Sequence, residues 1–127
     1  MDAKDKLEGY LINLGLTYEK ITDDTWVIND SSQGLNEVMI MVEDPVAIVR
    51  VVVMTVPKAN REVFFETILK LNANDLIYGA YGILGDQLIL QNCLLLETLD
   101  LPELQSTLDE VGLALAEHYP VLSKYMK

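Results

Sequence analysis

The sequence predicts an α+β fold: an antiparallel sheet of about five strands with three helices, in the order α-β-β-β-β-α-β-β-α. Apolar residues recur at helical spacing in three segments, near the start, the middle and the end of the chain. Between these segments they form short alternating or β-branched runs, broken by Gly, Pro and Asp at hairpin distances. Half of the 127 residues are apolar, which is enough for one core, so we expect residues 1–127 to form a single domain.

The first half of the chain is expected to contain one helix and four strands. In residues 2–14 the apolar side chains lie on one helical stripe, and Gly15 ends the helix. Strands are predicted at residues 17–22, 25–29, 35–43 and 46–56.

The strand at residues 46–56 is apolar on both faces, with Val52 and Met54 predicted to share one of them. A half-solvated strand carries polar residues on one face. Either both faces are therefore covered, or one of them is a binding surface.

The middle helix, residues 60–72, has an apolar stripe that is wider than packing on one sheet requires. Phe64 and Ile68 lie on one line of the helix, and Phe65 and Leu69 lie about a quarter-turn away. Two interpretations remain open. The helix is set deeply in the core, or its extra flank contacts a second subunit.

Three glycines, Gly79, Gly82 and Gly85, raise the question of a phosphate loop. Such a loop requires glycines between a strand and the start of a helix. Here they lie within and between two predicted strands, residues 76–84 and 86–96. Gly85 is expected to form the hairpin turn, and the other two a bulge or a close backbone approach.

The last and longest helix is expected to begin after Asp100, with Pro102 in its first turn. Its apolar residues repeat at 4-3 spacing, a pattern more typical of a core helix than of a coiled coil when the run is this short. Pro120 is expected to kink this helix or to end it near Tyr119.

The net charge of −11 disfavours nucleic acid and anionic membranes as partners, because both require a clustered positive surface. Between Lys70 and Lys124 there is no Lys or Arg. This acidic region either serves only as a solvated surface or attracts a basic segment of a partner. The sequence shows no signal peptide and no apolar run long enough to span a bilayer, so we expect a cytoplasmic protein.

Catalytic chemistry is sparse. His118 is the only histidine and Cys93 the only cysteine, and neither has a nucleophile, base or metal-ligand pattern around it. We expect His118 to pack at the edge of the core and Cys93 to be a buried, inert thiol. The sequence therefore predicts no enzyme activity, no cofactor and no metal site.

The passage ILKLNANDLIYGAYGILGDQLILQ, residues 68–91, resembles a known group of proteins. A helix ends in Leu71-Asn72 and leads into a glycine-bearing hairpin with a Gly85-Asp86 turn, followed by a strand and a C-terminal helix. This pattern is similar to that of the type III secretion chaperone-like fold, which includes the Tir-chaperone type and the YbjN-like proteins. The resemblance covers nearly the whole chain in element order.

The resemblance implies a non-enzymatic homodimer that holds a segment of another protein on apolar patches of its sheet and helices. On this basis the candidate dimer interface consists of Phe64, Phe65, Ile68 and Leu69. The candidate partner-binding surface consists of Met39, Met41, Val52 and Met54, although these methionines are also suited to filling a core.

Two alternatives stay open. A YbjN-like regulatory or small-ligand-binding domain is expected to have a cavity lined by Trp26, Tyr78 and Tyr81. A hydrolase using His118 would require that side chain to lie near a serine or Cys93 in a cleft.

Overall fold

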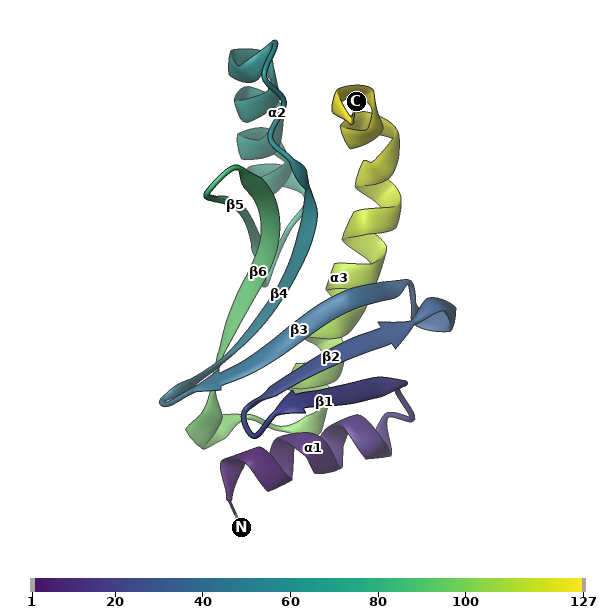
Figure 1. The fold of residues 1–127 in the computed structure, drawn as a ribbon, viewed down its shortest axis with the longest axis vertical. Helices are drawn as coiled ribbons and strands as arrows, with labels where there is room; N and C mark the ends of the chain where they lie inside the picture. Colours follow the sequence, from purple (N-terminus) through teal and green to yellow (C-terminus); the bar gives the residue numbers. More distant parts are fainter. Residues whose placement is uncertain (1, 127) are drawn as a thin grey trace.

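The computed structural model describes residues 2–126, which form a six-stranded antiparallel sheet in the order β1-β2-β3-β4-β6-β5, with three α-helices (Figure 1). The strands are β1 (Tyr18–Thr22), β2 (Thr25–Asp30), β3 (Leu35–Glu43), β4 (Val46–Thr55), β5 (Ala80–Leu84) and β6 (Gln87–Leu95). The helices are α1 (Ala3–Asn13), α2 (Arg61–Asn74) and α3 (Leu101–Leu122), and short 3-10 turns lie at η1 (Ser31–Gln33), η2 (Leu96–Thr98) and η3 (Ser123–Tyr125).

The α+β class and the element order are confirmed, and one detail of the sheet differs. It has six strands rather than about five, because both short hairpins join the central β3–β4 pair in the same sheet. Strand β2 pairs with β3, and β6 pairs with β4 over the whole length of β6.

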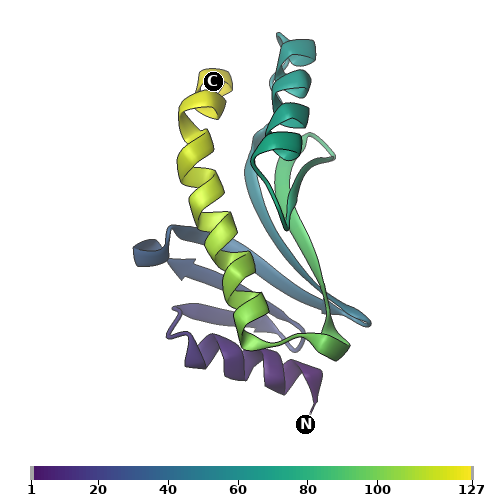
Figure 2. The same ribbon diagram turned by 180° about the vertical axis from the view of Figure 1, so that it is seen from behind.

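Helix α3 lies along one face of the sheet, which we call the inner face (Figures 1 and 2). Its side chains Leu104, Leu108 and Val111 are buried in the core. At Gly112 the helix comes so close to η1 that a Cβ atom would lie 2.6 Å from the carbonyl oxygen of Gln33. A side chain at this position would therefore push α3 away from the sheet.

Both ends of α3 test the sequence prediction. At its start the Asp100 carboxylate accepts a hydrogen bond from the backbone N–H of Glu103 at 2.8 Å, as expected of an N-cap. At its end the helix continues through Pro120 to Leu122, so an end near Tyr119 is wrong. Leu122 is buried, and its packing holds the last turn despite the hydrogen bond that proline cannot donate.

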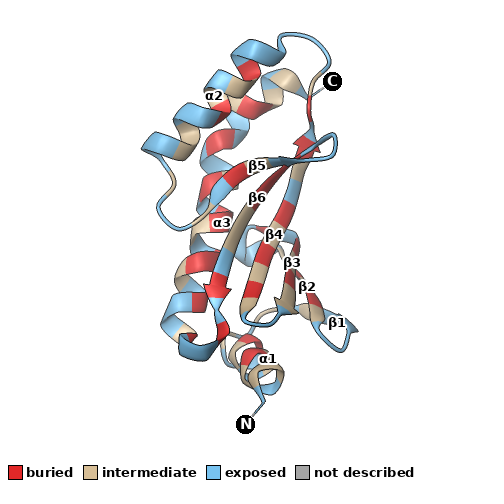
Figure 3. Ribbon diagram, turned by 90° about the vertical axis from the view of Figure 1, so that its left-hand side faces the viewer, coloured by how far each residue is buried: buried red, intermediate tan, exposed pale blue. Residues whose placement is uncertain are grey.

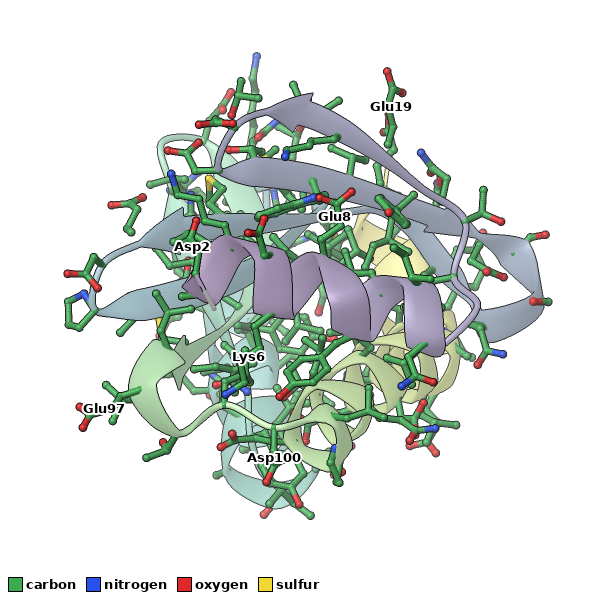
Figure 4. The ribbon with its side chains drawn as sticks, turned by 90° about the horizontal axis from the view of Figure 1, so that it is seen from below. Asp2, Lys6, Glu8, Glu19, Glu97 and Asp100 are labelled. Carbon is green, nitrogen blue, oxygen red and sulfur yellow. The ribbon has the colours of Figure 1, made fainter. Side chains whose placement is uncertain are left out.

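Helix α1 packs on the inner face at the β1–β2 end of the sheet (Figure 4). Leu7 and Leu11 are fully buried. On the strand side of the helix the Glu8 carboxylate accepts a hydrogen bond from the Tyr18 hydroxyl at 3.0 Å, whereas Lys6 projects from the opposite side (Figure 4). This hydrogen bond lowers the pKa of Glu8 below its usual value.

Strand β4 contains a β-bulge that overturns one prediction. Up to Val51, alternate residues point into the core, as the burial colours along β4 show (Figure 3). The pairing with β6 then shifts by one residue between Val52 and Met54. Because the extra residue reverses the alternation, Met54 and Val56 are buried on the inner face and do not share a face with Val52.

The β5–β6 hairpin turns at Gly85, whose φ of 64° is the left-handed conformation that a tight turn requires. Gly79 is a close backbone approach, since a Cβ atom there would lie 3.1 Å from the carbonyl oxygen of Gln91. The register along β5 is continuous, so there is no bulge at Gly82. Strand β5 begins at Ala80, four residues later than predicted, because the preceding backbone binds α3 instead of β6.

The free edge of β5 is bound by a side chain of α2. The Asn72 amide donates a hydrogen bond from Nδ2 to the backbone oxygen of Tyr81 at 3.1 Å. Its Oδ1 accepts one from the backbone N–H of the same residue at 2.7 Å. One side-chain amide thus takes the place of a neighbouring strand near the start of β5.

Candidate partner-binding surface

The sheet has a second face, opposite α3, which we call the outer face. In Figure 1, β2 and β3 cross in front of α3, so this face of those strands is turned toward the viewer. Strand pairing places its side chains in rows, with Met39 beside Arg50, Met41 beside Ile48 and Val52 beside Ile89. The outer face consists of Val27, Met39, Met41, Ile48, Arg50, Val52, Ile89, Gln91 and Cys93.

The outer face is mainly apolar, although no helix packs on its centre. Val52 is 51% exposed, and the two methionines of β3 are only partly covered by their neighbours. The one charged side chain, Arg50, donates a hydrogen bond from Nε to Gln91 Oε1 at 2.7 Å. A hollow of about 270 Å³ lies between β2, β3 and β4, and its lining is half apolar and half polar: Val27, Met39, Val52, Asn36, Glu37 and Arg50. Such a surface suits apolar side chains of an incoming chain.

Three of the four residues predicted for partner binding lie together on this face: Met39, Met41 and Val52. Met54 does not belong to it. It is 8% exposed and part of the core, because the bulge in β4 turns it inward.

The residues predicted for the dimer interface divide into two pairs. Phe64 and Ile68 are buried in the core of their own chain, where Phe64 packs edge-on against Tyr125 with 5.0 Å between the ring centroids. Phe65 is only partly buried, and Leu69 is 67% exposed. Phe65 and Leu69 share a stripe of α2 with Asn72, which contacts β5. We call Phe65 and Leu69 the α2 flank. Of the four residues predicted for the dimer interface, these are the two whose side chains are free to contact another molecule.

His118 lies in a buried hydrogen-bond network between α2, α3 and β5. The Tyr81 hydroxyl lies 2.6 Å from His118 Nδ1, and His118 Nε2 lies 3.0 Å from Asp75 Oδ2. A neutral imidazole satisfies all three groups, with Tyr81 donating to Nδ1 and Nε2–H donating to the carboxylate. Burial, together with the negative charge of Asp75, raises the pKa of Tyr81 well above its usual value.

The hydrolase interpretation required His118 to lie beside a serine or Cys93. Its two ring nitrogens instead contact the Tyr81 hydroxyl and the Asp75 carboxylate. Ser106 lies twelve residues before His118 on α3, which corresponds to about 18 Å along a helix. Cys93 is on the outer face, away from the network.

The position of Cys93 corrects a further prediction. The thiol is exposed, not buried, because Leu94 points into the core and the alternation of β6 turns Cys93 outward beside Ile48.

The three aromatic residues proposed to line a ligand cavity are not brought together. Trp26 on β2 and Tyr81 on β5 are separated by three strands and are both buried. Tyr78 precedes β5 and is exposed.

Sequence reasoning missed one contact altogether. The Glu110 carboxylate on α3 accepts hydrogen bonds from three successive backbone N–H groups, those of residues 77–79, at 2.7 to 3.2 Å. This contact holds the α2–β5 loop against α3. Nothing in the spacing distinguishes Glu110 from the other acidic residues of the helix.

Among residues 2–126 no group of His, Cys, Asp and Glu side chains is arranged to hold a metal ion. Within the same range no helix combines the length and the apolar character needed to cross a membrane.

The fold and the open apolar face define a class: small α+β sheet proteins with the architecture of type III secretion chaperones. The CesT_Tir_1 family model, which represents a family of such chaperones, matches residues 1–127, so the chain belongs to that family.

Solved structures agree on the fold. The chain is similar to one chain of the heterodimeric complex ExoU-SpcU from the type III secretion system of Pseudomonas aeruginosa, with a TM-score of 0.72 and 14% identity over 90% of this chain and 95% of that chain. It is similar to YbjN from E. coli (TM-score 0.67, 14% identity, 91% of this chain and 90% of that chain). A third similar chain is in the HopA1-SchA chaperone-effector complex (TM-score 0.58, 12% identity, 90% of this chain and 87% of that chain). No curated protein sequence matches the chain.

Proposed function

We propose that this protein is a non-enzymatic chaperone that holds a segment of another protein on its outer face and acts as a homodimer through the α2 flank. The observation that carries the proposal is the uncovered apolar surface of β3 and β4 around Val52. Membership of a chaperone family and likeness to chains from two complexes of type III secretion proteins support the same role. The exposed Cys93 thiol suits a reducing compartment, and we propose that the protein acts in the cytoplasm.

Cys93 provides a direct test of partner binding, because it is the only thiol and lies on the outer face. A maleimide should alkylate it several-fold more slowly when a permanently unfolded polypeptide, such as reduced and carboxymethylated α-lactalbumin, occupies that face. Val52→Asp should abolish this protection, because it places a charge in the apolar contact. Ile12→Asp, at a similarly exposed residue of α1, is the control and should keep it. An alkylation rate that the polypeptide leaves unchanged would contradict binding on this face.

The homodimer is tested by light scattering. The wild type should have about twice the 14.3 kDa mass of the chain. Leu69→Glu should convert it to a folded monomer, because the substitution places a carboxylate on the α2 flank without touching the core. Ile12→Glu is the matched control and should stay dimeric, since Ile12 is 64% exposed on α1. A monomeric wild type would overturn the dimer and leave the outer face to be tested by alkylation.

A further inference from the structure

A second hollow lies on the other side of the molecule from the outer face, between α3 and the α2–β5 loop. Its volume is about 340 Å³. The residues that matter for its chemistry are Ile77 and Tyr78 of the loop, and Asp109, Glu110, Leu113 and Glu117 of α3. We call these six residues the α3 groove.

Two apolar side chains that line the α3 groove are open to solvent. Ile77 of the loop is 83% exposed, and Leu113 of α3 is 62% exposed. The loop is fixed in this position, because Glu110 holds the backbone N–H groups of residues 77–79. Ile77 is thus held outward and does not fold back onto the core, which leaves a pre-formed apolar site.

The rim of the groove is negative. Asp109 and Glu117 lie one helical turn to either side of Leu113, so the two carboxylates are about 12 Å apart along α3. Within residues 2–126 neither of them has a hydrogen bond or an ion pair. The sequence offers no Lys or Arg between Lys70 and Lys124 to neutralise them.

The other two carboxylates near the groove differ, because both already have partners. Glu110 is bound to three N–H groups, and Asp75 is bound to His118. The charge available to an incoming molecule is therefore concentrated at Asp109 and Glu117, on either side of an apolar centre.

We propose that the α3 groove binds a cationic, apolar segment of a partner protein. One apolar side chain packs between Leu113 and Ile77, and a Lys or Arg on each side pairs with Asp109 and Glu117. Tyr78 adds a ring face on which a cation stacks favourably. Charge complementarity selects this occupant, since an acidic segment would face two unpaired carboxylates and a neutral one would leave both without partners. The inference rests on the proposed function only in taking a protein as the partner; it needs neither the outer face nor the dimer.

The test measures calorimetric binding of a synthetic peptide, KLLKLLKKLLKLLK, against the same peptide with Glu in place of Lys. The wild type should bind the Lys peptide and not the Glu peptide. Glu117→Lys should weaken binding at least about tenfold, since it replaces attraction by repulsion at the rim. Leu113→Ser should weaken it by a similar factor, because it removes the apolar contact.

Two control variants separate the site from the overall charge of the protein. Glu97→Lys changes the net charge by the same amount at a side chain that points into solvent in η2 (Figure 4), and it should change the affinity less than about twofold. Ile12→Ser removes an exposed apolar side chain elsewhere and should have no effect. Equal losses in Glu117→Lys and Glu97→Lys, or no binding of the Lys peptide by the wild type, would overturn the proposal.

The outer face can be tested separately in the same experiment. The loss of affinity caused by Glu117→Lys should be the same in the Val52→Asp background as in the wild type, because the two surfaces are separate. If the α3 groove fails this test while Val52→Asp still abolishes the protection of Cys93, the proposed function stands without the second site.

Discussion

The inner and outer faces of the sheet are built from the same strands with similar apolar residues, yet the inner face is covered and the outer face is largely open, with Ile89 its one apolar residue that is buried. Val51 and Val52 are neighbours in β4, and they are 4% and 51% exposed. The difference does not come from the strand sequence. It comes from α1 and α3, which pack on one side, and it shows that an apolar strand face becomes core only where another element covers it.

The sharpest test of this difference compares two adjacent residues of β3. Ile40 is fully buried on the inner face, so Ile40→Ala should lower the free energy of unfolding by about 2 to 5 kcal/mol. Met39→Ala, on the outer face, should cost less than about 1 kcal/mol, because little packing is lost. Urea denaturation of both variants measures the contrast, and equal losses would mean that the outer face is covered.

Two glycine-to-alanine substitutions allow a covered helix surface to be compared with an open one. Gly112→Ala should cost about 1 to 3 kcal/mol, because the new methyl group would meet the Gln33 carbonyl oxygen beneath α3. Gly9→Ala in α1 should instead stabilise the protein by about 0.5 to 1 kcal/mol, since nothing lies within 4 Å of the added Cβ atom and alanine favours the helix. Thermal unfolding should shift in opposite directions for the two variants.

The inner face also sets an alkaline limit to stability. The pKa of Tyr81 is raised above its usual value, so the folded state holds this proton more tightly than the unfolded state. The stabilising effect is complete below pH 10, and stability should fall above it by up to about 1.4 kcal/mol per pH unit from this one group. Tyr81→Phe should be less stable at pH 8, because His118 loses a hydrogen-bond donor, but its stability should fall less steeply above pH 10. Tyr119→Phe, at an exposed tyrosine, is the control in the same urea titrations.

The smallest effect is expected on the outer face itself. Val52→Thr keeps the shape and the β-branched backbone preference and adds only a hydroxyl. Since Val52 is half exposed, the free energy of unfolding should change by less than about 0.5 kcal/mol. A loss of more than 1 kcal/mol in urea would show that Val52 packs against something in the free protein.

Much of the fold was predictable because each element is signalled locally. The helical stripe of α1, the Asp100 cap of α3 and the Gly85 turn are properties of short stretches, and the structure has all three. The apolar run of β4 predicted a sheet with both faces covered or with one face open for binding; the structure has one covered face and one largely open face, and binding on the open face stays a prediction. The exposed position of Cys93 was also predictable in principle, from the alternation that turns Leu94 inward.

The errors concern contacts that depend on the whole fold. The bulge that turns Met54 inward cannot be recognised in the sequence, because it lies in a run of valines. The sheet order, which separates Trp26 from Tyr81, is not encoded in any local pattern. The partners of His118 lie 37 and 43 residues away, so the sequence alone did not reveal the network. The sequence also did not reveal that Phe64 is buried while Leu69 is exposed, because Phe64 is covered by Tyr125 of η3, whose position depends on the whole fold.

The amide of Asn72 affects how the sheets of neighbouring molecules can associate at high protein concentration. It binds both backbone groups of Tyr81 at the β5 edge, and Glu110 binds the N–H of Gly79 just before it. In the described part of the chain, β1 carries no comparable side-chain block along its free edge. A fibre needs two joining edges on every molecule. Because the β5 edge is already bound by Asn72, sheets of neighbouring molecules cannot add to one another at both edges, which opposes the growth of filaments through the sheet.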